Sequence, residues 1–199
     1  MNTHPRIYLA SQSPRRRELL RQIRVDFEVL LPAVGVDETP RADESPLDYV
    51  QRVCNDKVHA GWEELQRSGK PVFPVLAADT TVALGDDILG KPRDQADAAD
   101  MLHRLSGQRH QVMTAIALRL GQRSESRVSV TTVDFIELGS ARIQHYLDSG
   151  EWHDKAGAYA IQGLAGAFAR RLDGSYSGVM GLPLFETAEL LRAFDYPSP

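Results

Sequence analysis

The chain has 199 residues, of which 42% are hydrophobic and 25% charged, a composition typical of a globular domain with one sizeable core. Its formal net charge of −4 at pH 7 excludes the basic surface of a nucleic-acid-binding protein and gives no attraction to anionic membranes. Cys54 is the only cysteine, so one chain forms neither a disulfide nor a thiolate metal cluster. We therefore expect a single cytoplasmic domain, residues 1–199, without nucleic-acid or membrane partners.

The first half of the chain alternates between β-prone apolar runs and segments with helical periodicity. Strands are expected at residues 7–10, 26–31 and 74–78, and helices at residues 14–23 and 45–65. In chain order, the first three of these segments form a strand–helix–strand opening. Asp79 is expected at the end of the last of these strands.

The second half adds two long β-prone segments between helical ones. Helices are expected at residues 94–105 and 140–147 and from Pro183 onward, and strands at 112–120 and 127–138 about a polar turn at 121–126. Because the two long strands are close in sequence, we expect them to pair antiparallel. The predicted fold is an α/β mixed twisted sheet with flanking helices.

Residues 11–17, Ser-Gln-Ser-Pro-Arg-Arg-Arg, place two hydroxyls and three guanidiniums where the first strand enters the first helix. Ser13 suits the helix cap and Pro14 the first helical position. Free backbone N–H groups there favour an anion, and arginine adds bidentate contacts to phosphate. Cations at a helix N-terminus are unfavourable unless an anion compensates them. The residues alone therefore indicate a phosphate site, or equally a capped helix with solvated arginines.

Two carboxylates are candidates for binding a metal or a water molecule. Asp79 follows the apolar residues 74–78, and open α/β sheets bind ligands at the carboxyl ends of their strands. Glu38 lies in a loop after the second predicted strand and can complete a hard-cation site. For Asp79, a turn or capping role is the more common outcome, and Glu38 alone is a weak signal.

Residues 85–91 match the start of a P-loop, G-x-x-x-x-G-K, but Pro92 occupies the next position. Proline has neither the hydroxyl that binds Mg²⁺ nor an N–H for phosphate, which excludes a P-loop kinase or ATPase. Lys91 remains a candidate phosphate ligand, with a solvated lysine as the alternative.

Three features of the second half are less specific. His110 has no second ligand at metal-binding spacing, which favours a structural hydrogen bond. Residues 154–163, DKAGAYAIQG, let backbone approach a ligand, and Gln162 can contact the edge of a base; an ordinary turn-rich loop has the same composition. Tyr176 occupies the position where a nucleophile elbow requires serine.

In their order along the chain, these segments resemble the Maf family of nucleoside triphosphate pyrophosphatases. The resemblance covers essentially the whole chain. The matching blocks are SQSPRR (11–16), VDE (36–38), YVQRVCNDK (49–57), AADTT (77–81), GKPRD (90–94), SGQRHQVMTA (106–115), DKAGAYAIQG (154–163) and GSYSGVMGLPL (174–184).

The resemblance implies an elongated α/β fold with two lobes about a cleft, related to the inosine triphosphate pyrophosphatases. It also implies metal-dependent hydrolysis of a nucleoside triphosphate to the monophosphate and pyrophosphate. Arg15, Thr80 and Gln162 stand where the branch acting on dTTP and UTP carries its specificity residues. The implied substrates are therefore dTTP and UTP, with removal of modified pyrimidine nucleotides as a candidate role.

Residue roles follow from the same resemblance. Asp79 would be the general base that activates water, and Glu38 together with Asp79 would hold Mg²⁺ or Mn²⁺. The remaining substrate-binding side chains would be Ser11, Ser13, Arg15, Arg16, Lys57 and Lys91.

The alternative is a protein of another class, a nucleotide-sensing regulator of cell division, since the family takes its name from a septum-formation phenotype. A sensor needs only the basic phosphate ligands, whereas a hydrolase also needs Asp79 beside a water molecule. The sequence leaves the oligomeric state open, with a homodimer as one candidate.

Overall fold

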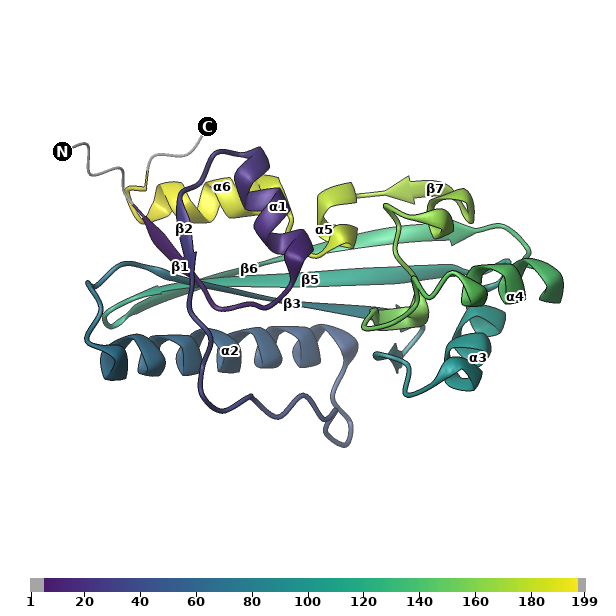
Figure 1. Ribbon diagram of the computed structural model, residues 1–199, viewed down its shortest axis with the longest axis horizontal. Helices are drawn as coiled ribbons and strands as arrows, with labels where there is room; N and C mark the ends of the chain where they lie inside the picture. Colours follow the sequence, from purple (N-terminus) through teal and green to yellow (C-terminus); the bar gives the residue numbers. More distant parts are fainter. Residues whose placement is uncertain (1–5, 197–199) are drawn as a thin grey trace.

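The computed structural model describes residues 6–196, which form a mixed sheet with helices on both faces (Figure 1). The strands are β1 (Ile7–Leu9), β2 (Phe27–Val29), β3 (Val75–Leu84), β4 (Asp87–Leu89), β5 (Arg109–Leu120), β6 (Arg123–Phe135) and β7 (Ala169–Asp173). The α-helices are α1 (Pro14–Gln22), α2 (Pro46–Ser68), α3 (Gln95–Leu105), α4 (Ser140–Asp148), α5 (Tyr176–Met180) and α6 (Leu184–Ala193). Two short 3₁₀ turns are η1 (Ala156–Ala158) and η2 (Leu164–Ala167).

The strand order is β2-β1-β3-β5-β6-β7, with β4 paired to β3 beside this series. β1 runs parallel to β2 and β3, as the strand–helix–strand opening predicts. β3, β5, β6 and β7 pair antiparallel, and β4 is antiparallel to β3. The predicted mixed α/β sheet is confirmed.

Three apolar clusters hold the helices on this sheet. α2 lies along one face of β3 and β5, where Val50, Val53 and Val58 are fully buried. α1 and α6 cover the opposite face at the same end of the sheet (Figure 1). α3 and α4 pack around the far end together with η1 and η2. None of the helices between residues 6 and 196 combines the length and apolar character that crossing a membrane requires.

Two predicted boundaries are wrong. Asp79 does not end a strand, because β3 continues from Val75 to Leu84 and pairs with β5 from Val75 to Ala83. Thr80, Thr81 and Val82 are β-branched and favour the extended backbone. The expected turn at 121–126 is also shorter, since β6 already begins at Arg123.

Candidate active site

A cleft opens where β3 lacks a neighbour along one edge. β1 pairs with β3 only as far as Leu76, and β4 pairs with it only from Val82 onward. Residues 77–81 therefore have a free edge, and the cleft beside them has a volume of about 830 Å³. Successive side chains of a strand point to opposite faces, so Asp79 and Thr80 enter the cleft from opposite faces of β3.

The cleft lies between two halves of the molecule. One half contributes the N-terminal end of α1, the loop after β2 and the middle of α2, and the other contributes the β4 end and residues 154–156 with Tyr159. The backbone N–H of Gly157 donates to Gly90 O at 3.1 Å, and a Cβ on Gly157 would come within 2.9 Å of Val82. Glycine therefore allows this loop to lie against β3. The predicted two lobes about a cleft are confirmed.

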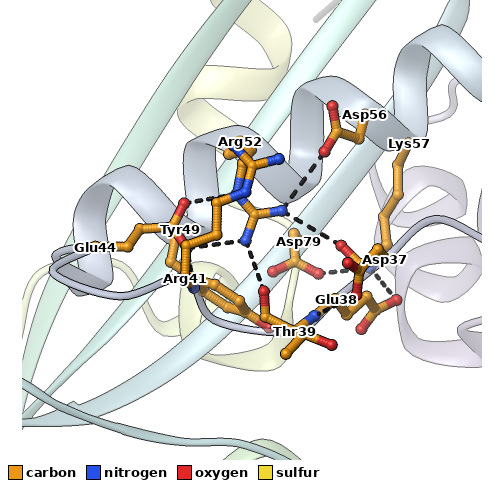
Figure 2. Close-up of polar contacts among 10 residues, drawn as sticks. All are labelled: Asp37, Glu38, Thr39, Arg41, Glu44, Tyr49, Arg52, Asp56, Lys57 and Asp79. Carbon is orange, nitrogen blue, oxygen red and sulfur yellow. Dashed lines mark hydrogen bonds and ion pairs between the residues drawn. The ribbon is translucent and has the colours of Figure 1, made fainter.

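Two carboxylates converge on one ammonium group on the α2 side of the cleft (Figure 2). Lys57 Nζ lies 2.6 Å from Asp79 Oδ1 and 2.8 Å from Glu38 Oε1. The Asp79 side chain is only 9% exposed. Burial alone would raise the pKa of the Glu38 carboxyl. The hydrogen bond and charge of Lys57 nevertheless hold this pKa below its usual value. We call Glu38, Lys57 and Asp79 the carboxylate side of the cleft.

The chemistry of the carboxylate side fits a hard divalent cation. Glu38 and Asp79 already share one positive charge, and they supply the oxygen ligands that Mg²⁺ and Mn²⁺ prefer. Within residues 6–196, no group of three or more His, Cys, Asp or Glu side chains is placed to bind a metal. Two carboxylates are nevertheless enough for Mg²⁺ when substrate phosphates complete its coordination.

Arg16 ties the start of α1 to β3 and to the end of α5. Its guanidinium donates to Gly181 O at 2.9 Å, to Ser11 Oγ at 3.1 Å and to Thr80 Oγ1 at 3.3 Å. Thr80 in turn shares a hydrogen bond of 2.9 Å with the hydroxyl of Thr114. The side chains of Arg16 and Thr80 are thus fixed before any ligand arrives.

Three further cations line the cleft without a carboxylate partner. In the part of the chain that the structure describes, no carboxylate lies within ion-pair distance of Arg15, Lys91 or Lys155. Burial, and next the charge of Arg16, lowers the pKa of Arg15. Burial and the charge of Arg15 likewise lower the pKa of Lys155. We call Arg15, Lys91 and Lys155 the cationic side, and its uncompensated charge suits a polyanion.

Most of the predicted site residues come together in this cleft. Ser13 is the N-cap residue of α1 and Pro14 its first residue, as expected, although the Ser13 side chain makes no capping hydrogen bond. Gln162 is exposed and is not among the residues that line the cleft, so its base-reading role stays a prediction. The predicted residues that line the cleft are Ser11, Ser13, Arg15, Arg16, Glu38, Lys57, Asp79, Thr80 and Lys91.

Three further residues line the cleft without an individual role predicted from the sequence: Lys155, Tyr159 and Tyr49. Lys155 and Tyr159 belong to the segment 154–163, which was singled out for its composition but in which only Gln162 was given a role. Tyr159 OH lies 2.9 Å from His110 Nε2 inside the protein. The structural role predicted for His110 is therefore confirmed.

Known proteins are similar to this chain over nearly its whole length. A family model described as Maf-like protein matches residues 6–194. A protein of Nitrosomonas europaea named dTTP/UTP pyrophosphatase is 56% identical, over 94% of this chain and 93% of its own length. A protein of the same name from Aromatoleum aromaticum is 53% identical, over 96% and 97% of the two chains. The Staphylococcus aureus Ham1 protein has a TM-score of 0.49 at 14% identity, covering 95% of this chain and 97% of that one.

Proposed function

Because this chain belongs to the Maf family, we propose that it hydrolyses nucleoside triphosphates, dTTP and UTP in preference, to the nucleoside monophosphate and pyrophosphate. The observation that carries the proposal is the division of the cleft into two sides. On the carboxylate side, Glu38 and Asp79 share one ammonium, and on the cationic side no described carboxylate lies within ion-pair distance of the three cations. The name shared by the relatives from Nitrosomonas europaea and Aromatoleum aromaticum supports the choice of substrates.

The proposed reaction is a direct attack of water on the α-phosphorus. Asp79 accepts a proton from the water, whose oxygen bonds to the α-phosphorus while the bond from that phosphorus to the bridging oxygen breaks. Pyrophosphate leaves with the electron pair of the broken bond. Arg15, Lys91 and Lys155 stabilise the charge that develops on it. No covalent intermediate with the protein forms.

Glu38 and Asp79 are the proposed ligands of Mg²⁺ or Mn²⁺, which when bound supplies positive charge to the phosphate oxygens. Lys57 reaches both carboxylates and holds them in place in the ligand-free protein. We place the reaction in the cytoplasm, since Cys54 is a buried free thiol and one chain needs no oxidising compartment.

A panel of triphosphates tests the proposal. With Mg²⁺ present, pyrophosphate release should have its highest kcat/KM for dTTP and UTP, and modified pyrimidine triphosphates should be included because their removal is a candidate role. GTP or 7-methyl-GTP exceeding both dTTP and UTP would overturn the substrate assignment. Tight nucleotide binding without turnover of any triphosphate would favour the nucleotide-sensing regulator instead.

A further inference from the structure

The loop that carries Glu38 has few apolar contacts of its own. It covers residues 30–45, between β2 and α2, and Leu30 is its only buried residue. Val34 is 75% exposed and Val36 is only partly buried against the α2 cluster. A segment with so little buried apolar surface depends on polar contacts to keep one conformation.

Those polar contacts come from α2 and fall on the backbone on both sides of Glu38 (Figure 2). The guanidinium of Arg52 donates to the carbonyl oxygens of Asp37 at 3.3 Å and Thr39 at 3.0 Å. Tyr49 OH donates to the carbonyl oxygen of Glu38 itself at 2.9 Å. Three consecutive carbonyls are therefore held by two side chains that lie one turn apart on the same helix.

Arg52 is itself fixed in position. It donates to both carboxylate oxygens of Glu44, at 2.6 and 2.8 Å, and lies 3.6 Å from a carboxylate oxygen of Asp56. Its side chain is 14% exposed, and its guanidinium lies 5.5 Å from the ring centre of Tyr49. The hydrogen bond from Arg52 lowers the pKa of Glu44 to about 2, so this pair stays charged at any working pH. Glu44 also accepts from the backbone N–H of Arg41 at 3.0 Å.

We propose that Arg52 is a positioning residue, which clamps the loop 37–44 onto α2 and thereby fixes the Glu38 carboxylate beside Lys57 and Asp79. Arg52 does not line the cleft, so it acts on the reaction only through the backbone that carries Glu38. The inference rests on the proposed function, because that function gives Glu38 its role in holding the metal.

The geometry requires arginine and not merely a positive charge. A guanidinium presents five N–H donors in a rigid plane, which lets it bind a carboxylate with two bonds while it reaches two carbonyls. An ammonium has three donors around one point and cannot satisfy these separated acceptors together. Arg52→Lys is therefore expected to behave like Arg52→Gln.

The main test is a double-mutant cycle between Arg52 and Glu38 with dTTP and Mg²⁺. Arg52→Gln should lower kcat by about 10- to 100-fold, since a displacement of about 1 Å in a reacting group costs up to that much. The KM for dTTP should change little, because the cationic side is untouched. In a Glu38→Gln background, the same Arg52→Gln change should alter kcat by no more than about twofold, because residues that act through one another are not additive.

Two results of the cycle would overturn the clamp while the hydrolase assignment stands. One is an equal loss from Arg52→Gln in both backgrounds, which would show that Arg52 acts on the fold in general. The other is recovery of most of kcat in Arg52→Lys. If Glu38→Gln alone leaves kcat unchanged, the proposed role of Glu38 fails, and with it the clamp as a catalytic device.

A second measurement needs no turnover. In the ligand-free protein, the backbone amides of Thr39, Arg41 and Glu44 donate hydrogen bonds within the loop. They should exchange hydrogen about tenfold or more faster in Arg52→Gln than in the wild type, because the loop then opens at a lower free-energy cost. Unchanged exchange would contradict the clamp. Mn²⁺ titrated in the presence of an α,β-imido analogue of dTTP should also bind more weakly to Arg52→Gln.

Two further variants provide an independent test and a control. Tyr49→Phe removes one hydrogen bond to Glu38 and keeps the packing of the ring, so it should lower kcat by about 2- to 10-fold even if Arg52→Gln fails to fold. No loss in Tyr49→Phe would count against the clamp. Glu63→Gln is the matched control on α2, because Glu63 is exposed and lies about three turns along the helix from Arg52, so it should leave kcat and amide exchange unchanged.

Discussion

The two sides of the cleft differ in whether their charges are already paired. On the carboxylate side, Lys57 lies within 2.8 Å of oxygens of both Glu38 and Asp79, so the three groups hold one another in place. On the cationic side, Arg15 and Lys155 instead donate to carbonyl oxygens of the chain, at 3.1 and 2.8 Å. The two sides therefore have different tasks. The carboxylate side holds its side chains in place before a ligand binds, whereas the cationic side needs a polyanion to balance its charge.

The cationic side stores unfavourable electrostatic energy in the free protein. Burial and repulsion by neighbouring cations lower the pKa values of Arg15 and Lys155: Arg16 repels Arg15, and Arg15 repels Lys155. A ligand that brings several negative charges relieves this repulsion and therefore stabilises the folded protein by mass action. Binding and catalysis should respond to different substitutions.

Asp79→Asn should have the largest effect on turnover. It removes the proposed general base and should lower kcat by about 10² to 10⁴-fold, while dTTP still binds because the cationic side is intact. Steady-state kinetics and nucleotide titration of the same variant measure the two quantities. Asp86→Asn, in the exposed turn before β4, is the control. Near-normal turnover in Asp79→Asn would make Asp79 a structural residue.

Lys91→Ala should act on binding instead. Loss of one charge-assisted phosphate contact, worth about 1.5 to 3 kcal/mol, lowers kcat/KM by about 10- to 150-fold for every triphosphate alike. Pyrophosphate should raise the melting temperature of the wild type more than that of Lys91→Ala. Lys70→Ala, which removes a lysine paired with Glu28 outside the cleft, is the matched control. A loss confined to pyrimidine nucleotides would contradict the role of Lys91 as a phosphate ligand.

Gln162→Leu tests whether a residue outside the lined cleft selects the base. A polar group left unpaired costs about 1 to 3 kcal/mol, which lowers kcat/KM by about 5- to 150-fold. The loss should affect only the nucleotide whose base makes the contact. We therefore expect a narrower gap between dTTP or UTP and the purine triphosphates ATP and GTP. Gln122→Leu, in the β5–β6 turn, serves as control. An equal loss for all four nucleotides would refute base reading.

His110 should have the smallest effect on turnover, because its buried ring does not line the cleft; its effect is on the stability of the fold. Burial lowers the pKa of His110 to about 4, against about 6.5 for an unfolded histidine. The unfolded chain thus binds the proton more readily, so the stabilisation is complete above about pH 6.5 and is lost as the pH falls toward 4. The slope reaches at most about 1.4 kcal/mol per pH unit.

Urea unfolding between pH 7 and pH 4.5 checks this. His110→Gln should lose less stability with acidification than the wild type, whereas His59→Gln, at an exposed position on α2, should follow the wild type. Identical pH profiles for wild type and His110→Gln would show that His110 does not titrate on unfolding.

The sequence predicted the fold best where periodicity is strong. α2 and α3 were expected within a few residues of their ends, because Pro46 and the capping residues Ser45 and Asp94 mark their starts. β7 and α5 were not predicted, since they are five residues each and lack an apolar period. Asp79 was predicted to end a strand because a charged residue interrupts the apolar run. The strand nevertheless continues beyond Asp79, because β3 pairs with β5 on both sides of it.

The site was predictable in its residue types but not in its pairings. Nine residues singled out from the sequence line the cleft, from Ser11 to Lys91 along the chain. That Lys57 bridges Glu38 and Asp79 could not be predicted, because the three residues come from a loop, a helix and a strand far apart in sequence. No role was predicted for Arg52, since its carbonyl partners carry no sequence signal.

The long central strands also determine how the cleft can move. β3 and β5 share nine residue pairs and β5 and β6 share twelve, and these ladders run from one half of the molecule into the other (Figure 1). A hinge needs a few residues that absorb large changes in φ and ψ, and continuous ladders offer none between the halves. The two walls of the cleft are therefore held in a fixed position relative to one another. Any closure over a bound ligand is left to residues 31–36, before the segment that Arg52 holds, and to the loop at 150–163.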